Sequence, residues 1–295
     1  MIRYPLALTG IETAVTSEVA TWLTRAEART TFFTRHSGYT EEYCDAKGKK
    51  RKLSPFWGEV KQVYMRRQHN KCVYCETKLE GGQYGKVQWD LEHFRPKGNV
   101  RKWPIVTSFP TGDDWPSGYY LLAYHLYNYA VSCQSCNRSF KSDFFPIASA
   151  RIAGKLDPAD YMAEEAFLVY PLGISDEDPE NLLTFDGATV IPKQLARQDA
   201  PRWRRGQVII DFFALNRDPL KYSRASWLLR TVWPNIQLAR QENIEAKSNV
   251  NWLCSELAPF THCARCFVAL CDTDLPTAKN MLLDFKAIVT DMEGS

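Results

Sequence analysis

Two Cys-x-x-Cys pairs constrain the fold of this chain more than any other feature of its sequence. Cys72 and Cys75 form the first pair, and Cys133 and Cys136 form the second. Zinc is readily held by four thiolates at the corners of a tetrahedron, and two such pairs supply them with suitable spacing. We favour a structural zinc ion over two unrelated pairs of buried thiols, because the pairs flank a segment rich in potential catalytic side chains. Four thiolates complete the coordination shell and leave no open position for a substrate.

The cysteine count and the lack of long apolar runs favour a cytoplasmic protein. Nine cysteines cannot all pair as disulfides, and disulfides rarely persist in the reducing cytosol. No apolar run approaches the roughly 20 residues of a membrane span, and the N-terminal stretch is too weakly patterned for a signal peptide. The net charge of +3, from 37 basic and 34 acidic residues, excludes a strongly basic surface and leaves local contacts with nucleic acid open.

A second group of cysteines lies near the C-terminus, at Cys254, Cys263, Cys266 and Cys271. The segment THCARCFVALC reads as a buried helix, and a free cysteine packs well as a small hydrophobic residue. A partner pair at metal-ligand spacing is missing. We therefore favour buried thiols over a second metal site, and metal analysis of the protein would decide between them.

Hydrophobic periodicity and turn residues predict an α+β fold with short strands and many helices. The pair Asp186-Gly187 is a strong hairpin signal between two short β-like runs. The predicted elements are a helix at 11–30, a charged loop at 41–54, a helix at 55–68, a strand at 87–93, a long loop at 99–118, a short helix at 137–145, a strand at 166–170, hairpin strands at 183–185 and 189–191, and helices from 201 onward.

Candidate catalytic side chains lie between the two cysteine pairs. Glu92 lies on the predicted strand and is followed directly by His93, while Asn137 comes immediately after Cys136. The oxygens of Glu92 and Asn137 suit magnesium, which takes few protein ligands and keeps several waters. His93 then remains free as a general base, since an imidazole titrates near neutral pH. Asp90 shares a strand face with Glu92, but a solvated or salt-bridged aspartate is the better interpretation there.

The order and spacing of these residues resemble the HNH endonucleases, also called ββα-metal nucleases, in their four-cysteine form. The three letters of that name fall on His93, Asn128 and Asn137. Glu92 stands where Asp is commoner, and a longer carboxylate still reaches a metal ion. The resemblance implies a small ββα-metal core with zinc knuckles, an adjacent β-hairpin and helical N- and C-terminal regions. The implied regions are a helical region at 1–60, the HNH core at 61–146, a hairpin extension at 147–200 and a helical region at 201–295.

Shorter words extend the resemblance to the HNH component of Septu-type and retron-linked anti-phage defence systems, where the nuclease acts beside an ABC-type ATPase. These words are Glu92–Lys97, Cys136–Lys141 with Phe145-Pro146 after it, the Asp-Pro segment before Leu182–Phe185, and Leu215–Arg217. The resemblance implies a DNA endonuclease used in defence, with an ATPase as partner protein. The helical C-terminal third is our candidate for docking that partner.

The resemblance also implies a role for each site residue. His93 takes a proton from the attacking water, and Glu92 with Asn137 holds Mg²⁺ or Mn²⁺ against the scissile phosphate. Asn128 orients the His93 loop by hydrogen bonding, although a simple turn-capping role fits it nearly as well. Arg95 and Lys141 contact phosphates.

Two rival functions remain open at this point. A non-catalytic zinc module that binds nucleic acid or a protein needs the four cysteines, but it does not need Glu92, His93 and Asn137 together. An RNA-directed HNH nuclease would use the same site, and the chain shows no RNA-reading module that separates RNA from DNA.

Overall fold

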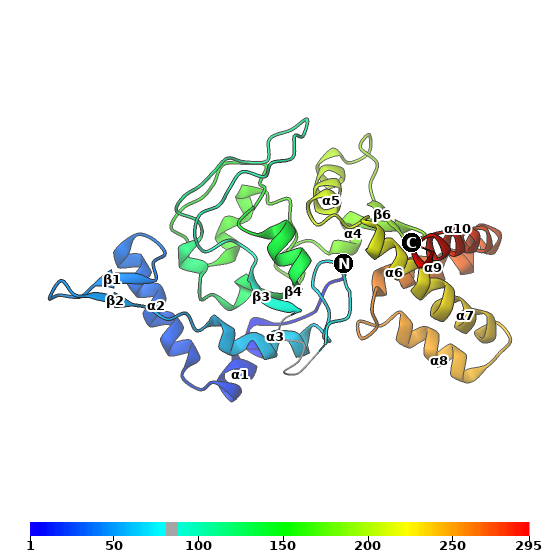
Figure 1. The fold of residues 1–295 in the computed structure, drawn as a ribbon, viewed down its shortest axis with the longest axis horizontal. Helices are drawn as coiled ribbons and strands as arrows, with labels where there is room; N and C mark the ends of the chain where they lie inside the picture. The colour runs from blue at the N-terminus through cyan, green and yellow to red at the C-terminus, as the bar shows by residue number, and fades with distance from the viewer. Residues whose placement is uncertain (81–87, 295) are drawn as a thin grey trace. The chain divides into compact units, whose positions relative to one another are not determined.

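The computed structural model describes residues 1–80 and 88–294. The chain is a mixed α+β protein, as predicted, and divides into two compact units. One unit holds Tyr4–Asn70 and Leu79–Asp176, and the other holds Met1–Arg3, Lys71–Lys78 and Glu177–Ser295 (Figure 1). None of the described helices is long and apolar enough to cross a membrane. The division into four regions stays a prediction.

The first unit, Tyr4–Asn70 with Leu79–Asp176, begins with two helices, α1 (Leu8–Glu18) and α2 (Trp22–His36). The prediction of one helix at 11–30 is therefore wrong. Val19 leaves helical geometry at φ −138° and ψ 81° and ends α1. Buried Ile11, Val15 and Trp22 keep helix-like spacing across this break, so the periodicity of the sequence does not reveal it.

A small hairpin follows where a loop was predicted at 41–54. It pairs β1 (Glu42–Cys44) with β2 (Lys50–Lys52). Asp45 organises the turn, because its carboxylate accepts hydrogen bonds from the backbone N–H groups of Lys47 and Lys49, each at 3.0 Å. Both strands are short and largely exposed, so they lack the apolar alternation by which strands are recognised.

The predicted helix at 55–68 is confirmed as the 3₁₀ turn η1 (Trp57–Val60) and the helix α3 (Lys61–Arg67). The predicted strand at 87–93 is confirmed as β3 (Trp89–His93), with Val87 outside the described residues. Two 3₁₀ turns, η3 (Tyr120–Leu122) and η4 (Leu126–Asn128), follow the long loop.

Strand β4 (Tyr129–Cys133) then runs antiparallel to β3, with His93 opposite Tyr129 and Trp89 opposite Cys133. The chain turns at once into η5 (Ser135–Lys141), a π-helix that stands where the short helix was predicted. Because β3 pairs with β4 and η5 follows β4 directly, residues that are far apart in the chain lie close together around this two-stranded sheet.

The predicted strand at 166–170 is wrong. Ala166 forms only an isolated bridge to Ile147, and Phe167–Tyr170 belong to no strand of the described sheets. These four residues are all buried, which explains why they look like a core strand in the sequence. The 3₁₀ helix η6 (Pro158–Glu164) precedes them.

The second unit, Met1–Arg3 with Lys71–Lys78 and Glu177–Ser295, is mainly helical. The predicted hairpin is confirmed as β5 (Leu183–Asp186) paired with β6 (Thr189–Pro192). Gly187 in its turn has φ +56°, and an added Cβ would lie 2.9 Å from the Phe285 ring, so only glycine fits there. The helices are α4 (Pro179–Leu182), α5 (Ala200–Phe212), α6 (Asp218–Trp227), η7 (Leu228–Val232), α7 (Trp233–Ala239), α8 (Ile244–Leu253), α9 (Thr261–Thr273) and α10 (Leu275–Glu293).

Candidate metal centre and neighbouring pocket

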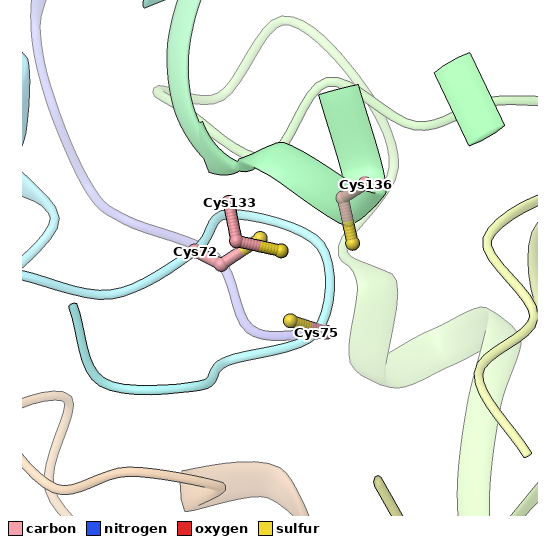
Figure 2. A group of neighbouring side chains, drawn as sticks. All are labelled: Cys72, Cys75, Cys133 and Cys136. Atoms are coloured by element: carbon pink, nitrogen blue, oxygen red, sulfur yellow. The ribbon is translucent and has the colours of Figure 1, made fainter. Parts of the chain in front are cut away.

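The four cysteines of the two Cys-x-x-Cys pairs form one cluster. The sulfur atoms of Cys72, Cys75, Cys133 and Cys136 all lie within 4.8 Å of one another, and the four side chains point toward a common centre in Figure 2. Three of the cysteines are buried and Cys133 is half-buried. Four converging thiols are close enough to bind a metal ion such as zinc, which prefers this donor set and a tetrahedral shell.

Local backbone structure shapes both halves of the cluster. The Cys72–Cys75 turn closes where the Glu76 N–H donates to the Cys72 carbonyl at 3.0 Å, with Glu76 at φ +61°. The Thr77 hydroxyl lies 3.2 Å from the Cys75 sulfur, close enough to stabilise a thiolate. In the other half, Cys133 ends β4 and Cys136 lies in the first turn of η5.

The C-terminal cysteines have a different environment. Cys263 and Cys271 are buried in α9. Burial raises the pKa of Cys263 to about 12 and that of Cys271 to about 11, so both are protonated thiols at neutral pH. Within residues 1–80 and 88–294, the only cysteine, histidine and carboxylate group with metal-ligand spacing is the Cys72 cluster.

Glu92, His93 and Asn137 line the same pocket, which has a volume of about 400 Å³. Glu92 and His93 are the last two residues of β3, and Asn137 lies in η5. The antiparallel pairing of β3 with β4, followed by the immediate turn into η5, explains how Glu92 and His93 reach one cavity with Asn137, which lies 45 and 44 positions later in the chain. The predicted metal ligands and the predicted general base are therefore brought together.

The Glu92 carboxylate is buried and held from two sides. Its side chain is 2% exposed, and the Ser132 hydroxyl donates to its Oε2 at 3.0 Å. The Lys141 ammonium lies 3.8 Å from its Oε1 and also donates to the His93 carbonyl at 3.4 Å. Burial lowers the pKa of Lys141 to about 8, and the Glu92 carboxylate opposes that change. A buried carboxylate needs such a partner, because an unpaired buried charge is costly.

Among the described residues, the Nδ1 nitrogen of His93 has no hydrogen-bond partner. Its Nε2 lies 3.0 Å from the Ala123 carbonyl oxygen, and a carbonyl only accepts, so Nε2 carries the proton. Burial holds the pKa of His93 well below its usual value, which keeps the ring neutral and leaves the lone pair on Nδ1. The Trp57 and Tyr129 rings, with centroids 5.0 and 5.1 Å away, stand nearly perpendicular to the imidazole and fix its plane.

Asp90 orients the side-chain amide of Asn137. The Asn137 Nδ2 lies 3.3 Å from Asp90 Oδ2, and a carboxylate only accepts, so the amide nitrogen faces Asp90. The Asn137 Oδ1 is left for another ligand. Asp90 also forms an ion pair with Arg138, at 2.8 Å from Nε, which confirms the salt-bridged interpretation of this aspartate.

Asn128 lies beneath the loop that follows His93. Its Oδ1 accepts the Arg95 N–H at 2.8 Å, and its Nδ2 donates to the carbonyls of Arg95 and Leu122 at 3.0 and 3.1 Å. The side chain is buried and does not line the pocket. Its contacts fix the backbone two residues after His93.

Arg95 and Lys141 were expected to contact phosphates, but both side chains are buried in ion pairs. The Arg95 guanidinium is buried, ion-paired with Glu164 and lies over the rings of Tyr119 and Phe145. Lys141 is buried against Glu92. Neither lines the pocket, so neither is placed to contact a phosphate there.

Two further pocket residues received no role from the sequence. Trp57 lies in η1, far from the motif in the chain, and only the tertiary structure places it beside His93. Lys97 is the last residue of the Glu92–Lys97 word and lines the pocket as well. Its place in that word is the signal that could have found it.

Comparison with known proteins gives one match to a curated protein. The chain is 30% identical over 194 residues to the Septu protein PtuB of Bacillus mycoides strain KBAB4. The match covers 66% of this chain and 57% of PtuB, so it spans a little more than half of that relative's length. No family profile and no solved structure matches the chain.

Proposed function

We propose that this protein is a metal-dependent HNH endonuclease that hydrolyses DNA phosphodiester bonds in a Septu-type anti-phage defence system. The observation that carries the proposal is the common pocket of Glu92, His93 and Asn137, beside a cluster of four cysteines. The order of β3, β4 and η5 along the chain supports the proposal, because a ββα-metal core needs two strands followed by a helix. Similarity to the Septu protein PtuB supports the role in defence.

The donor atoms in the pocket fit a hard divalent cation. Glu92 offers a carboxylate oxygen, and the orientation of Asn137 by Asp90 leaves its amide oxygen available. Mg²⁺ or Mn²⁺ prefers such oxygen ligands and is satisfied by one or two of them plus waters. Once bound, the ion supplies a positive charge that offsets the charge developing on the leaving oxygen.

The protein's own groups perform the remaining tasks. His93 accepts the proton of the attacking water at Nδ1, since Nε2 is already committed to the Ala123 carbonyl. Asn128 positions His93 by holding the backbone of the loop that follows it. Lys141 forms an ion pair with the buried Glu92 carboxylate and holds it in place. The four cysteines hold a structural zinc ion and take no part in the chemistry.

Cleavage of plasmid DNA tests this function. Wild type, His93→Ala and Asn137→Ala are incubated with supercoiled plasmid and Mg²⁺ or Mn²⁺, with and without a co-encoded ABC-type ATPase. We expect nicking by wild type and a loss of at least a hundredfold in His93→Ala, the usual scale for a general base. His36→Ala is the matched control, because His36 is an exposed histidine on α2.

Equal cleavage by wild type and His93→Ala would refute the catalytic assignment. Absence of cleavage under every metal and partner condition, with retained binding of nucleic acid, would favour the non-catalytic zinc module. Cleavage of RNA but not DNA under the same conditions would replace the proposed substrate. Copurification with the ATPase, lost on deletion of residues 200–295, would support partner docking by the helical C-terminal part, and unchanged copurification would exclude it.

A further inference from the structure

We propose that Lys97 is the phosphate-anchoring residue of this pocket and binds a phosphate of the nucleic acid beside the Glu92–His93–Asn137 group. The inference rests on the proposed function, and it replaces Arg95 and Lys141 as the expected phosphate contacts. Lys97 is the only cationic side chain among the described residues that line the pocket.

The other nearby cations are already committed. Arg95 pairs with Glu164, Lys141 with Glu92, and Arg138 with Asp90. A phosphate that entered the pocket would have to break one of these ion pairs to use its cation. Two of the three pairs are also buried, so breaking them would leave an uncompensated charge.

Lys97 is held by aromatic rings instead. Its Nζ lies 4.6 Å from the centre of the Trp57 ring and 5.3 Å from that of Tyr39. A ring face attracts a cation but does not use up its N–H donors as a carboxylate does. The Glu41 carboxylate, which opposes the lowered pKa of Lys97, accepts the Tyr39 hydroxyl at 2.6 Å. Among the described residues, no carboxylate lies within ion-pair distance of Lys97.

Partial burial strengthens the interaction that Lys97 can make. Removal from water lowers the pKa of Lys97 from its usual value, because the charged form has lost hydration without gaining an anionic partner. A phosphate in the pocket would restore that compensation, and in a partly desolvated site the attraction exceeds that of an exposed pair. Trp57 contacts both Lys97 and His93, so one ring sets the spacing between the anchoring cation and the proposed base.

Salt-dependent binding of a short DNA duplex tests the inference. Affinity is measured by fluorescence anisotropy across a range of KCl concentrations without added Mg²⁺ or Mn²⁺ and without a chelator, so that cleavage does not contribute and the structural zinc stays bound. Loss of one phosphate contact lowers the slope of log affinity against log salt by about 0.9. We expect this decrease, with an affinity loss of several-fold at low salt, for Lys97→Met and substantial recovery for Lys97→Arg.

Lys61→Met is the matched control. Lys61 also lies over a tryptophan ring, at 4.2 Å from the centre of Trp89, and donates to the Trp89 carbonyl, but it does not line the pocket. The slope of log affinity against log salt for Lys61→Met should equal that of wild type. An unchanged slope in Lys97→Met, or an equal decrease in Lys61→Met, would overturn the inference, as would a wild type that does not bind the duplex at all.

The failure of this inference and the failure of the nuclease assignment give different results. A decreased slope in Lys97→Met together with plasmid that stays uncut would retain the phosphate site and remove the proposed activity. Cleavage that depends on His93 together with an unchanged slope would retain the activity and remove Lys97 as the anchor.

Discussion

Replacing Lys141 by methionine should destabilise the protein through the Glu92 carboxylate. The two side chains are 0% and 2% exposed, with 3.8 Å between Lys141 Nζ and Glu92 Oε1. At that separation and an effective dielectric constant near 20, the Coulomb attraction is about 4 kcal/mol. Breaking a buried pair by removing one partner usually costs about 3–5 kcal/mol. For a unit of this size, about 4 kcal/mol corresponds to a fall in melting temperature of roughly 8–16 °C.

The assay is thermal unfolding at neutral pH, followed by circular dichroism, in a double-mutant cycle. Glu92→Gln in the Lys141→Met background removes the orphaned charge, so we expect it to recover much of the lost stability. Lys247→Met is the control, since Lys247 pairs with Glu242 at the surface and such pairs contribute less than about 1 kcal/mol. Strictly additive effects of Lys141→Met and Glu92→Gln would refute the pairing argument.

Three further predictions concern the metal, the pH and one turn. Metal analysis should find about one zinc ion per chain, lost with the fold in Cys136→Ser and retained in Cys266→Ser; equal zinc in both variants would contradict the cluster assignment. Burial lowers the pKa of His262 from 6.5 to about 3, so on acidification the unfolded state binds a proton below about pH 6.5 while the folded state does not. The free energy of unfolding therefore falls as the pH drops below 6.5, by about 2 kcal/mol at pH 5. His262→Phe should flatten that dependence in urea titrations, and an unchanged pH profile would exclude His262 as its source. Gly187→Ala should cost about 1–3 kcal/mol in chemical unfolding, because of its positive φ and the nearby Phe285 ring, and a neutral effect would mean that the turn relaxes.

Local patterns predicted elements well where one local rule dominates. The Asp186-Gly187 turn specified its hairpin, and the apolar spacing after residue 201 specified helices, because a turn type and a helix face each depend on neighbouring residues. Periodicity failed at Val19, where the helix breaks without a breaking residue. It failed again at Phe167–Tyr170, whose burial comes from tertiary packing and not from a sheet.

The two cysteine pairs illustrate what the sequence by itself determined. Thiol chemistry and the two-residue spacing select tetrahedral metal binding whatever lies between the pairs, and the structure brings the four sulfurs within 4.8 Å of one another. The sequence also proposed Glu92, His93 and Asn137 as one site, because a carboxylate, an imidazole and a carboxamide suit hydrolysis at a hard metal ion, and the structure places all three in one pocket.

Only the tertiary structure decided which of the nearby cations lines the pocket. In the sequence Arg95, Lys97 and Lys141 are equivalent positive charges near one motif. In the folded chain Arg95 is buried against Glu164 and Lys141 against Glu92. Lys97 instead lines the pocket and lies over aromatic rings. The physical reason is that the ion-pair partners and the solvent exposure of a charged side chain decide what it can bind, and both depend on residues that are distant in the chain.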